Sequence, residues 1–359
     1  MKRYTYLMIR TLLVLTIFAI LITAGCQKQP QTQEQPEEKA APPLPVVSAF
    51  YVNGRGENSS FTSFCEHKDI IDELSPLWYR LGGDGTLEES VDSEALAIAR
   101  ENGIKVIPLV ALAGNRSSGV LTDPVFRKAA ADNISRVVRE NGYDGINIDL
   151  EIIKSDGGDY ADVKEGLTAL LDELGGELKR QGKGLNVCVI PPLEPPSHLA
   201  PIYDLRALSM TADRVVMMAY DFCHDRTAAG PVAPLSWVKD NIDEILGMGV
   251  PPEKLSLGIA VYGYDWASNG TGAVARGNGE INRIADSYNV QIKWDAENQV
   301  PFINYTDPQV GEREIWFENS SSAEKKFELI KRFKLAGCSI WRLGFEDEFI
   351  WEEVGKMAD

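Results

Sequence analysis

Two carboxylates and one amide alternate with apolar residues in the segment 142–151, GYDGINIDLE. In a β-strand, successive side chains point to opposite faces, so Asn147, Asp149 and Glu151 share one face and the apolar residues between them share the other. A strand inside a parallel sheet is normally apolar on both faces, because both are covered. Burying three polar groups in a row is costly unless they are paired or used. The pattern therefore favours a catalytic strand over an edge strand with a solvated face.

The two carboxylates of this segment lie at different depths along the strand. Asp149 precedes Glu151 by two residues, which corresponds to roughly 6.5–7 Å along the backbone. Glu151 is expected at the rim, and Asp149 below it is better placed to hydrogen-bond Glu151 and a substrate than to attack as a nucleophile. Like-charge repulsion between the two groups favours the protonated form of Glu151, as a general acid requires.

The spacing Asp-Gly-x-Asn-x-Asp-x-Glu resembles the catalytic signature of glycoside hydrolase family 18, the chitinase-like (β/α)8 barrels. Asp144, Asp149 and Glu151 match the family pattern, and Asn147 replaces its second Asp, as is typical of the spore-cortex-lytic and YaaH-like branch. The resemblance implies that Glu151 protonates the glycosidic oxygen while the 2-acetamido oxygen of the sugar attacks C1. Asp149 would orient that acetamide and stabilise the oxazolinium ion. Asp144, at the start of the strand, is expected to be structural, whereas Asn147, below Asp149, is expected among the substrate-binding residues.

Two further segments are similar to motifs of the same family. Residues Met218 to Asp221 (MAYD) resemble its Met-x-Tyr-Asp motif, in which the Tyr, here Tyr220, hydrogen-bonds the acetamido carbonyl and the Asp contacts the sugar or its neighbour. Residues 339–344 (SIWRLG) resemble the eighth strand, whose Trp, here Trp341, forms the floor of the catalytic subsite. Aromatic platforms for flanking sugars are expected after the seventh strand, at Tyr262, Tyr264 and Trp266. Platform and core packing are equally open for Phe50, Tyr51, Trp78 and Tyr79.

Strand and helix signals alternate along the chain, as a parallel α/β fold requires. Strands are expected at 46–52, 77–80, 104–112, 144–151, 185–190, 214–220, 255–262 and 338–343. Helices are expected at 67–74, 88–102, 124–141, 160–181, 235–248, 321–335 and 348–357. No helix is expected within 263–318, and so long a connection indicates a small β-rich insertion after strand seven. The predicted fold class is α/β, a (β/α)8 TIM barrel carrying this insertion.

Length and charge narrow the class of function. The chain has 359 residues, 44% of them hydrophobic, which fits one barrel domain. Its formal net charge of −17 argues against nucleic acid and against electrostatic docking on anionic lipid or wall polymer, and is compatible with a neutral glycan. The three histidines show no zinc spacing, so neither a metal nor another cofactor is expected. We expect a monomer with free thiols at Cys65, Cys188, Cys223 and Cys338 rather than a disulfide framework.

The first 25 residues are typical of a secretion signal. Lys2, Arg3 and Arg10 precede an apolar stretch at 11–22, and small residues lead directly to Cys26. This resembles a bacterial lipoprotein box, so we expect an exported protein held at the cell membrane only by a lipid on Cys26. An uncleaved anchor and an ordinary signal peptide are the alternatives. Residues 26–45, rich in Gln, Glu and Pro, are expected to form a disordered tether, and 46–359 the catalytic domain.

Together these features predict a glycosidase acting on β-1,4-linked N-acetylglucosamine-containing glycans. The substrate class is chitooligosaccharide or peptidoglycan, and the YaaH-like form of the motif slightly favours peptidoglycan. Two alternatives come from other classes of function, a glycan-binding lectin on the same barrel and a surface scaffold. The presence of Glu151 argues against the lectin.

Overall fold

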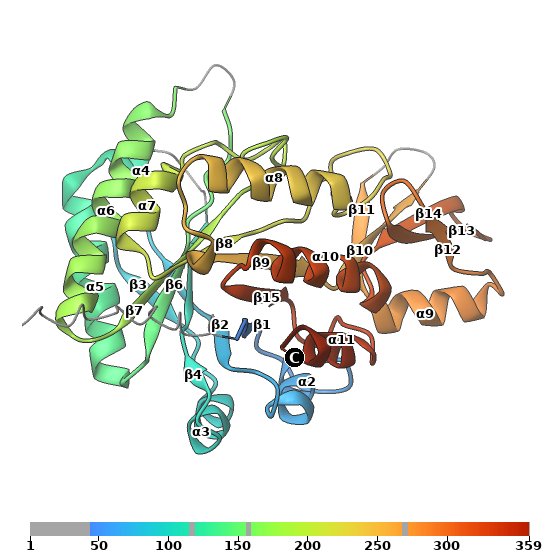
Figure 1. Ribbon diagram of the computed structural model, residues 1–359, viewed down its shortest axis with the longest axis horizontal. Coiled ribbons are helices and arrows are strands. Elements are labelled where there is room, and N and C mark those ends of the chain that lie inside the picture. The colour runs from blue at the N-terminus through green and yellow to red at the C-terminus, as the bar shows by residue number, and fades with distance from the viewer. Residues whose placement is uncertain (1–43, 115–118, 156–158, 268–271, 359) are drawn as a thin grey trace, which may run out of the picture. The chain divides into compact units, whose positions relative to one another are not determined.

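The computed structural model describes residues 44–114, 119–155, 159–267 and 272–358 (Figure 1). The expected secretion signal, nearly all of the expected tether and Cys26 lie outside these residues. None of the described helices is both long and apolar enough to span a membrane.

Eight parallel strands close into a barrel, which confirms the predicted fold class. Each strand pairs in parallel with the next, and β1 pairs with both β2 and β15, so no edge remains open. A prolyl residue, Pro108, divides the strand expected at 104–112 into β4 (Lys105–Val106) and β5. The barrel strands are β1 (Val46–Tyr51), β2 (Glu73–Leu81), β5 (Leu109–Leu112), β6 (Gly145–Asp149), β7 (Gly184–Val189), β8 (Arg214–Met217), β9 (Leu255–Ala260) and β15 (Gly337–Trp341).

Helices follow the barrel strands and cover them (Figure 1). The start of α5 is as predicted, because the Asp123 carboxylate accepts the Val125 N–H at 2.8 Å and Pro124 is the first helical residue. At its end, Gly142 adopts the left-handed conformation with φ 63°. The helices are α2 (Ser60–His67), α3 (Ser93–Glu101), α4 (Gly119–Thr122), α5 (Pro124–Asn141), α6 (Ala161–Arg180), α7 (Leu205–Thr211), α8 (Leu235–Gly247), α10 (Ser320–Phe333), α11 (Ile350–Ala358) and the short 3-10 helix η1 (Pro252–Lys254).

Two of the predicted helices differ from the structure, and two of the observed barrel helices were not predicted. The helix expected at 67–74 is wrong: α2 ends at His67, and Glu73 already opens β2. The helix expected from Glu88 begins only at Ser93, because residues 87–89 form β3 (Leu87–Glu89), which pairs antiparallel with β2. Helices α4 and α7 were not predicted from the sequence. In each case pairing or packing with a distant segment overrides the local pattern.

The segment after β9 forms a separate antiparallel sheet with its own helix. Its strands are β10 (Tyr262–Ala267), β11 (Ala273–Gly277), β12 (Lys293–Asp295), β13 (Val300–Asp307) and β14 (Gly311–Phe317), in the order β11-β10-β14-β13-β12. The expectation of no helix here is wrong, because α9 (Asn278–Ser287) packs Ile281 and Ala285, four residues apart, on one face of this sheet. The other face of β10 carries Tyr264 into the cavity described next.

Candidate active site

A cavity of about 330 Å³ opens where the barrel strands end. In (β/α)8 barrels this end of the strands holds the active site. A larger hollow of about 620 Å³ lies between residues 227–229 and the insertion, but it contains none of the motif carboxylates. The smaller cavity is therefore the candidate active site. It brings together seven of the residues predicted from the sequence: Asp149, Glu151, Met218, Tyr220, Asp221, Tyr262 and Trp341.

The two motif carboxylates reach this cavity from β6 and the loop that follows it. Asp149 is the last residue of β6 and pairs with Ala111 of β5. Glu151 was expected to be the last inward residue of the strand, but the strand ends two residues earlier and Glu151 lies in the loop. The backbone after Glu151 is held by the β7–α7 segment: Ala200 N–H donates to Ile152 O at 2.9 Å, and Lys154 N–H to His198 O at 2.8 Å. Both carboxylates are half-buried and line one wall.

Asn147 lies below the cavity rather than in its lining. Its side-chain amide is buried, donates to Ser75 Oγ at 3.1 Å and accepts from Cys188 Sγ at 3.4 Å. Burial, with a further contribution from nearby Asp149 and Glu151, raises the pKa of the Cys188 thiol well above its usual value, so this group stays a neutral donor. An amide can donate and accept at once, so Asn147 satisfies both neighbours without adding a third charge beneath the carboxylates.

Tyr220 presents a protonated hydroxyl beside the carboxylates. Burial raises its pKa well above the usual value, and the neighbouring Cys188, Asp149 and Asp221 raise it further. A phenol that keeps its proton is a hydrogen-bond donor, which is the role that the motif implies for it.

Asp221 is held in place by two tyrosines of the insertion. Its Oδ1 accepts hydrogen bonds from the hydroxyls of Tyr262 and Tyr264, the latter at 3.0 Å. Burial raises the pKa of Asp221, while both tyrosine hydrogen bonds lower it. Tyr262 was predicted as a sugar platform after strand seven. The structure places it as the first residue of β10, in the lining of the cavity, with its hydroxyl directed at Asp221.

Trp341, the last residue of β15, supplies an aromatic surface to the cavity. Its ring meets Phe50 edge to face, with 5.2 Å between centroids and 65° between planes. Phe50 lines the cavity as well. Of the aromatic platforms expected after strand seven, Tyr264 lines the cavity, whereas Trp266 is buried and donates to Thr227 O at 3.1 Å.

The other aromatic residues for which packing and platform roles were open have packing roles. Trp78 is buried and donates to Asn53 Oδ1 at 3.0 Å, and the hydroxyls of Tyr79 and Tyr143 lie 3.0 Å apart. Tyr51 is buried, with its hydroxyl bonded to Asp92.

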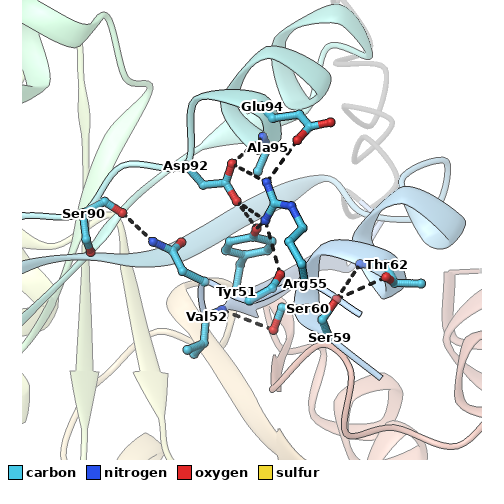
Figure 2. A network of polar contacts seen from close by, with 12 residues as sticks. Tyr51, Val52, Arg55, Ser59, Ser60, Thr62, Ser90, Asp92, Glu94 and Ala95 are labelled. Atoms are coloured by element: carbon cyan, nitrogen blue, oxygen red, sulfur yellow. Dashed lines mark hydrogen bonds and ion pairs between the residues drawn. The ribbon is translucent and has the colours of Figure 1, made fainter. Parts of the chain in front are cut away.

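Asp92 is the centre of a polar network that fixes the loop after β1 (Figure 2). Arg55 binds both of its oxygens, at 2.6 and 3.0 Å, and Glu94 at 3.1 Å. These contacts lower the pKa of Asp92 to about 2, with the Arg55 hydrogen bonds as the largest cause. Asp92 also caps α3 through the Ala95 N–H at 3.2 Å. The network ties the first loop of the barrel rim to α3, next to Phe50.

One charged residue of the cavity was not identified from the sequence. Arg80, near the end of β2, lines it two strands away from Asp149 of β6. No local pattern marked this arginine, because its direction depends on how β2 pairs with β5.

In the described part of the chain, no group of three or more His, Cys, Asp or Glu side chains could hold a metal ion. The thiols of Cys65, Cys188, Cys223 and Cys338 are free, as predicted.

Comparisons with known proteins agree with this architecture. The family model described as Glycosyl hydrolases family 18 matches residues 60–346. The cortical fragment-lytic enzyme of Bacillus subtilis (strain 168) is 29% identical over 326 residues, which cover 87% of this chain and 74% of that enzyme. The crystal structure of a chitinase from Chromobacterium violaceum ATCC 12472 superposes with a TM-score of 0.78 at 25% identity, covering 87% of this chain and 98% of that one. The spore cortex-lytic enzyme SleL of Bacillus megaterium QM B1551 shares the fold, with a TM-score of 0.76 at 24% identity over 88% of this chain and 74% of its own.

Proposed function

The chain belongs to glycosyl hydrolase family 18, close to its spore-cortex-lytic branch, and we propose that it is a retaining glycosidase for β-1,4-linked N-acetylglucosamine-containing glycans. The observation that carries the proposal is the convergence of Glu151, Asp149, Tyr220 and Asp221 around one cavity with Trp341. These side chains come from three different strand ends, so their meeting is not a consequence of sequence proximity.

In the proposed mechanism the substrate supplies its own nucleophile. Glu151, at the rim, protonates the glycosidic oxygen, and the 2-acetamido oxygen attacks C1 as the bond to the leaving sugar breaks. Asp149 orients the acetamide N–H and balances the positive charge of the cyclic oxazolinium ion. The protonated Tyr220 hydroxyl donates to the acetamido oxygen and positions it for attack. Water then opens the oxazolinium ion, and Glu151, now a carboxylate, takes the proton from that water.

The remaining polar and aromatic groups bind the sugar. Trp341 provides an apolar surface beneath the pyranose ring in the catalytic subsite. Asp221, oriented by Tyr262 and Tyr264, accepts a hydrogen bond from the sugar or from its neighbour.

Peptidoglycan is the substrate that we favour over chitooligosaccharide. The sequence similarity to a cortical fragment-lytic enzyme over most of both chains supports this choice. The similarity to a chitinase structure supports the alternative. We further propose that the protein is exported and anchored to the membrane by a lipid on Cys26, facing the cell wall or exterior, and that it acts as a monomer.

A digest of two purified polymers tests the proposed function. Peptidoglycan and N-acetylglucosamine oligomers are incubated with the protein, and the products are identified by mass. New reducing ends on N-acetylglucosamine support the proposal, and their ratio between the two substrates assigns the class. Binding of both glycans without any cleavage would favour the lectin, and neither binding nor cleavage would favour the scaffold.

A further inference from the structure

A β-bulge near the end of β2 turns Arg80 into the catalytic cavity. Leu77 pairs with Leu109 of β5, but the next pairs are Tyr79 with Val110 and Arg80 with Ala111, so β2 holds one extra residue at this point. With strict alternation, Leu77 and Tyr79 would share a face and Arg80 would point away. The extra residue reverses the alternation, and both Leu77 and Arg80 line the cavity.

The sheet register places Arg80 at the same level of the barrel as Asp149. Arg80 pairs with Ala111, and Ala111 pairs with Asp149. Two strand spacings of about 4.8 Å put the Cα atoms of Arg80 and Asp149 about 10 Å apart. The small side chain of Ala111 stands between them. A guanidinium group and the catalytic carboxylates therefore border the same space from separate strands.

The Arg80 side chain forms no hydrogen bond or ion pair with any residue that the structure describes, and it is exposed. Glu88 lies opposite Arg80 in the β2–β3 ladder, yet the two do not form an ion pair. Most buried or half-buried guanidinium groups of the described chain hold a carboxylate, namely those of Arg214, Arg276 and Arg313. In a chain with a net charge of −17, a cation without such a partner at the catalytic cavity is available to a ligand.

We propose that Arg80 binds a carboxylate of the glycan, carried by a sugar next to the N-acetylglucosamine in the catalytic subsite. This inference rests on the proposed function and deepens it, because it selects an acidic glycan over neutral chitin. A guanidinium group is a planar fork that matches a carboxylate with two parallel hydrogen bonds. N-acetylglucosamine oligomers contain no carboxylate. In peptidoglycan, each N-acetylglucosamine has N-acetylmuramic acid as its neighbour on either side.

The carboxylate has two sources in peptidoglycan. Where the stem peptide has been removed, the lactyl group of N-acetylmuramic acid ends in a free carboxylate. Where the peptide is present, that carboxyl is an amide and the anionic groups belong to the stem. Arg80 recognises the same chemistry in both cases, and the local positive charge offsets the repulsion that the acidic protein exerts on such a substrate.

A binding experiment separates this inference from the proposed function. All the proteins compared carry Glu151→Gln, which blocks turnover. They differ in whether they also carry Arg80→Gln. The ligands are stem-free glycan strands, strands with intact stems, stem-free strands whose carboxylates have been converted to amides, and a neutral N-acetylglucosamine hexamer. Arg206→Gln, an exposed arginine on α7 outside the cavity, is the matched control for net charge.

Arg80→Gln is expected to weaken binding of a carboxylate-bearing strand roughly 10- to 100-fold, the range for a hydrogen bond to a charged group. Binding of the amidated strands and of the hexamer should not change. Weaker binding of the stem-free strands would identify the lactyl carboxylate as the group that Arg80 binds. Weaker binding only of strands with stems would identify a carboxylate of the stem peptide. Arg80→Lys keeps the charge without the fork and should recover part of the affinity.

Two results would overturn the inference. Equal binding of carboxylate-bearing strands by the proteins with and without Arg80→Gln would show that Arg80 does not contact the substrate. Equal weakening on all four ligands would show that Arg80 acts on the fold or on the catalytic carboxylates. Failure of the otherwise unmodified protein to cleave any of the glycans would instead refute the proposed function, and it leaves the binding comparison valid.

Discussion

Tyr262, the first residue of insertion strand β10, donates its hydroxyl hydrogen to Asp221, which lies beyond the end of barrel strand β8. Tyr264, also from β10, donates to the same oxygen at 3.0 Å. The insertion therefore orients a carboxylate that lines the candidate active site. Asp221 itself has φ 62°, a left-handed conformation that is uncommon outside glycine, and the two hydrogen bonds stabilise the side chain that this backbone directs.

Removing one tyrosine donor should shift the pH dependence of catalysis. Burial raises the pKa of Asp221, and the hydrogen bonds from Tyr262 and Tyr264 lower it. Tyr262→Phe or Tyr264→Phe removes one of these hydrogen bonds and therefore raises this pKa further. Since ionised Asp221 then forms only at higher pH, the acidic limb of kcat/KM moves to higher pH. Pre-steady-state and steady-state rates of glycan cleavage, measured across pH 3–8, test this shift of the acidic limb.

Tyr288→Phe is the matched control for that shift. Tyr288 also belongs to the insertion and donates to a carboxylate, Asp307, at 2.7 Å, but neither residue lines the catalytic cavity. Its pH profile should match that of the unmodified protein. An acidic limb that stays in place in both Tyr262→Phe and Tyr264→Phe would contradict the role of Asp221.

Replacing the proposed acid should strongly slow cleavage and preserve binding. Glu151→Gln keeps the shape of the side chain but removes the proton that the leaving group needs. The rate of cleavage should fall by roughly 10²–10⁴-fold, the usual contribution of general acid catalysis. Single-turnover rates and oligomer affinity are measured together, with Glu140→Gln on α5 as a surface control. A variant that cleaves at a near-normal rate would exclude Glu151 as the acid.

The source of the nucleophile gives a second test of mechanism. Asp149 and Glu151 stand on one wall of the cavity, Asp149 at the end of β6 and Glu151 just beyond it. If the 2-acetamido group attacks C1, a sugar with a 2-amino or 2-hydroxy group in the catalytic subsite should be almost inert. A thiazoline that mimics the cyclic intermediate should inhibit, because the site stabilises that species better than the substrate. Hydrolysis of deacetylated oligomers at a rate comparable to that of the acetylated substrate would refute this mechanism. A glycosyl ester trapped on Asp149 would refute it as well.

Lipidation at Cys26 is tested by a single substitution. Cys26→Ala should stop incorporation of a fatty-acid analogue and release the protein from the membrane fraction, because the acidic chain offers little other affinity for an anionic lipid surface. Labelling and fractionation are compared with Cys65→Ser, which changes a half-buried thiol of the barrel domain. Label present in both Cys26→Ala and the unmodified protein, or absent from both, would reject the lipoprotein assignment.

The sequence alone determined the barrel and the positions that could act as acid and stabiliser. Alternation within one strand is a local property, so the shared face of Asn147, Asp149 and Glu151 follows from their spacing. Their difference in depth follows from the rise per residue, and the structure places Asn147 below the cavity and both carboxylates in its wall. The capping of α5 by Asp123 could be predicted for the same reason, because cap and helix are adjacent in the chain.

Tertiary structure decided what depends on partners distant in the chain. The direction of Arg80 is set by a bulge that exists only where β2 pairs with β5. The partner of Tyr262 is Asp221, 41 residues earlier, and docking of the insertion on the barrel brings them together. Trp78 and Tyr79 turned out to be buried, because neighbouring segments cover them. The local sequence pattern determines which side chains share a face of a strand and which residues cap a helix. Register shifts and contacts between distant segments depend on the free energy of the whole packed structure.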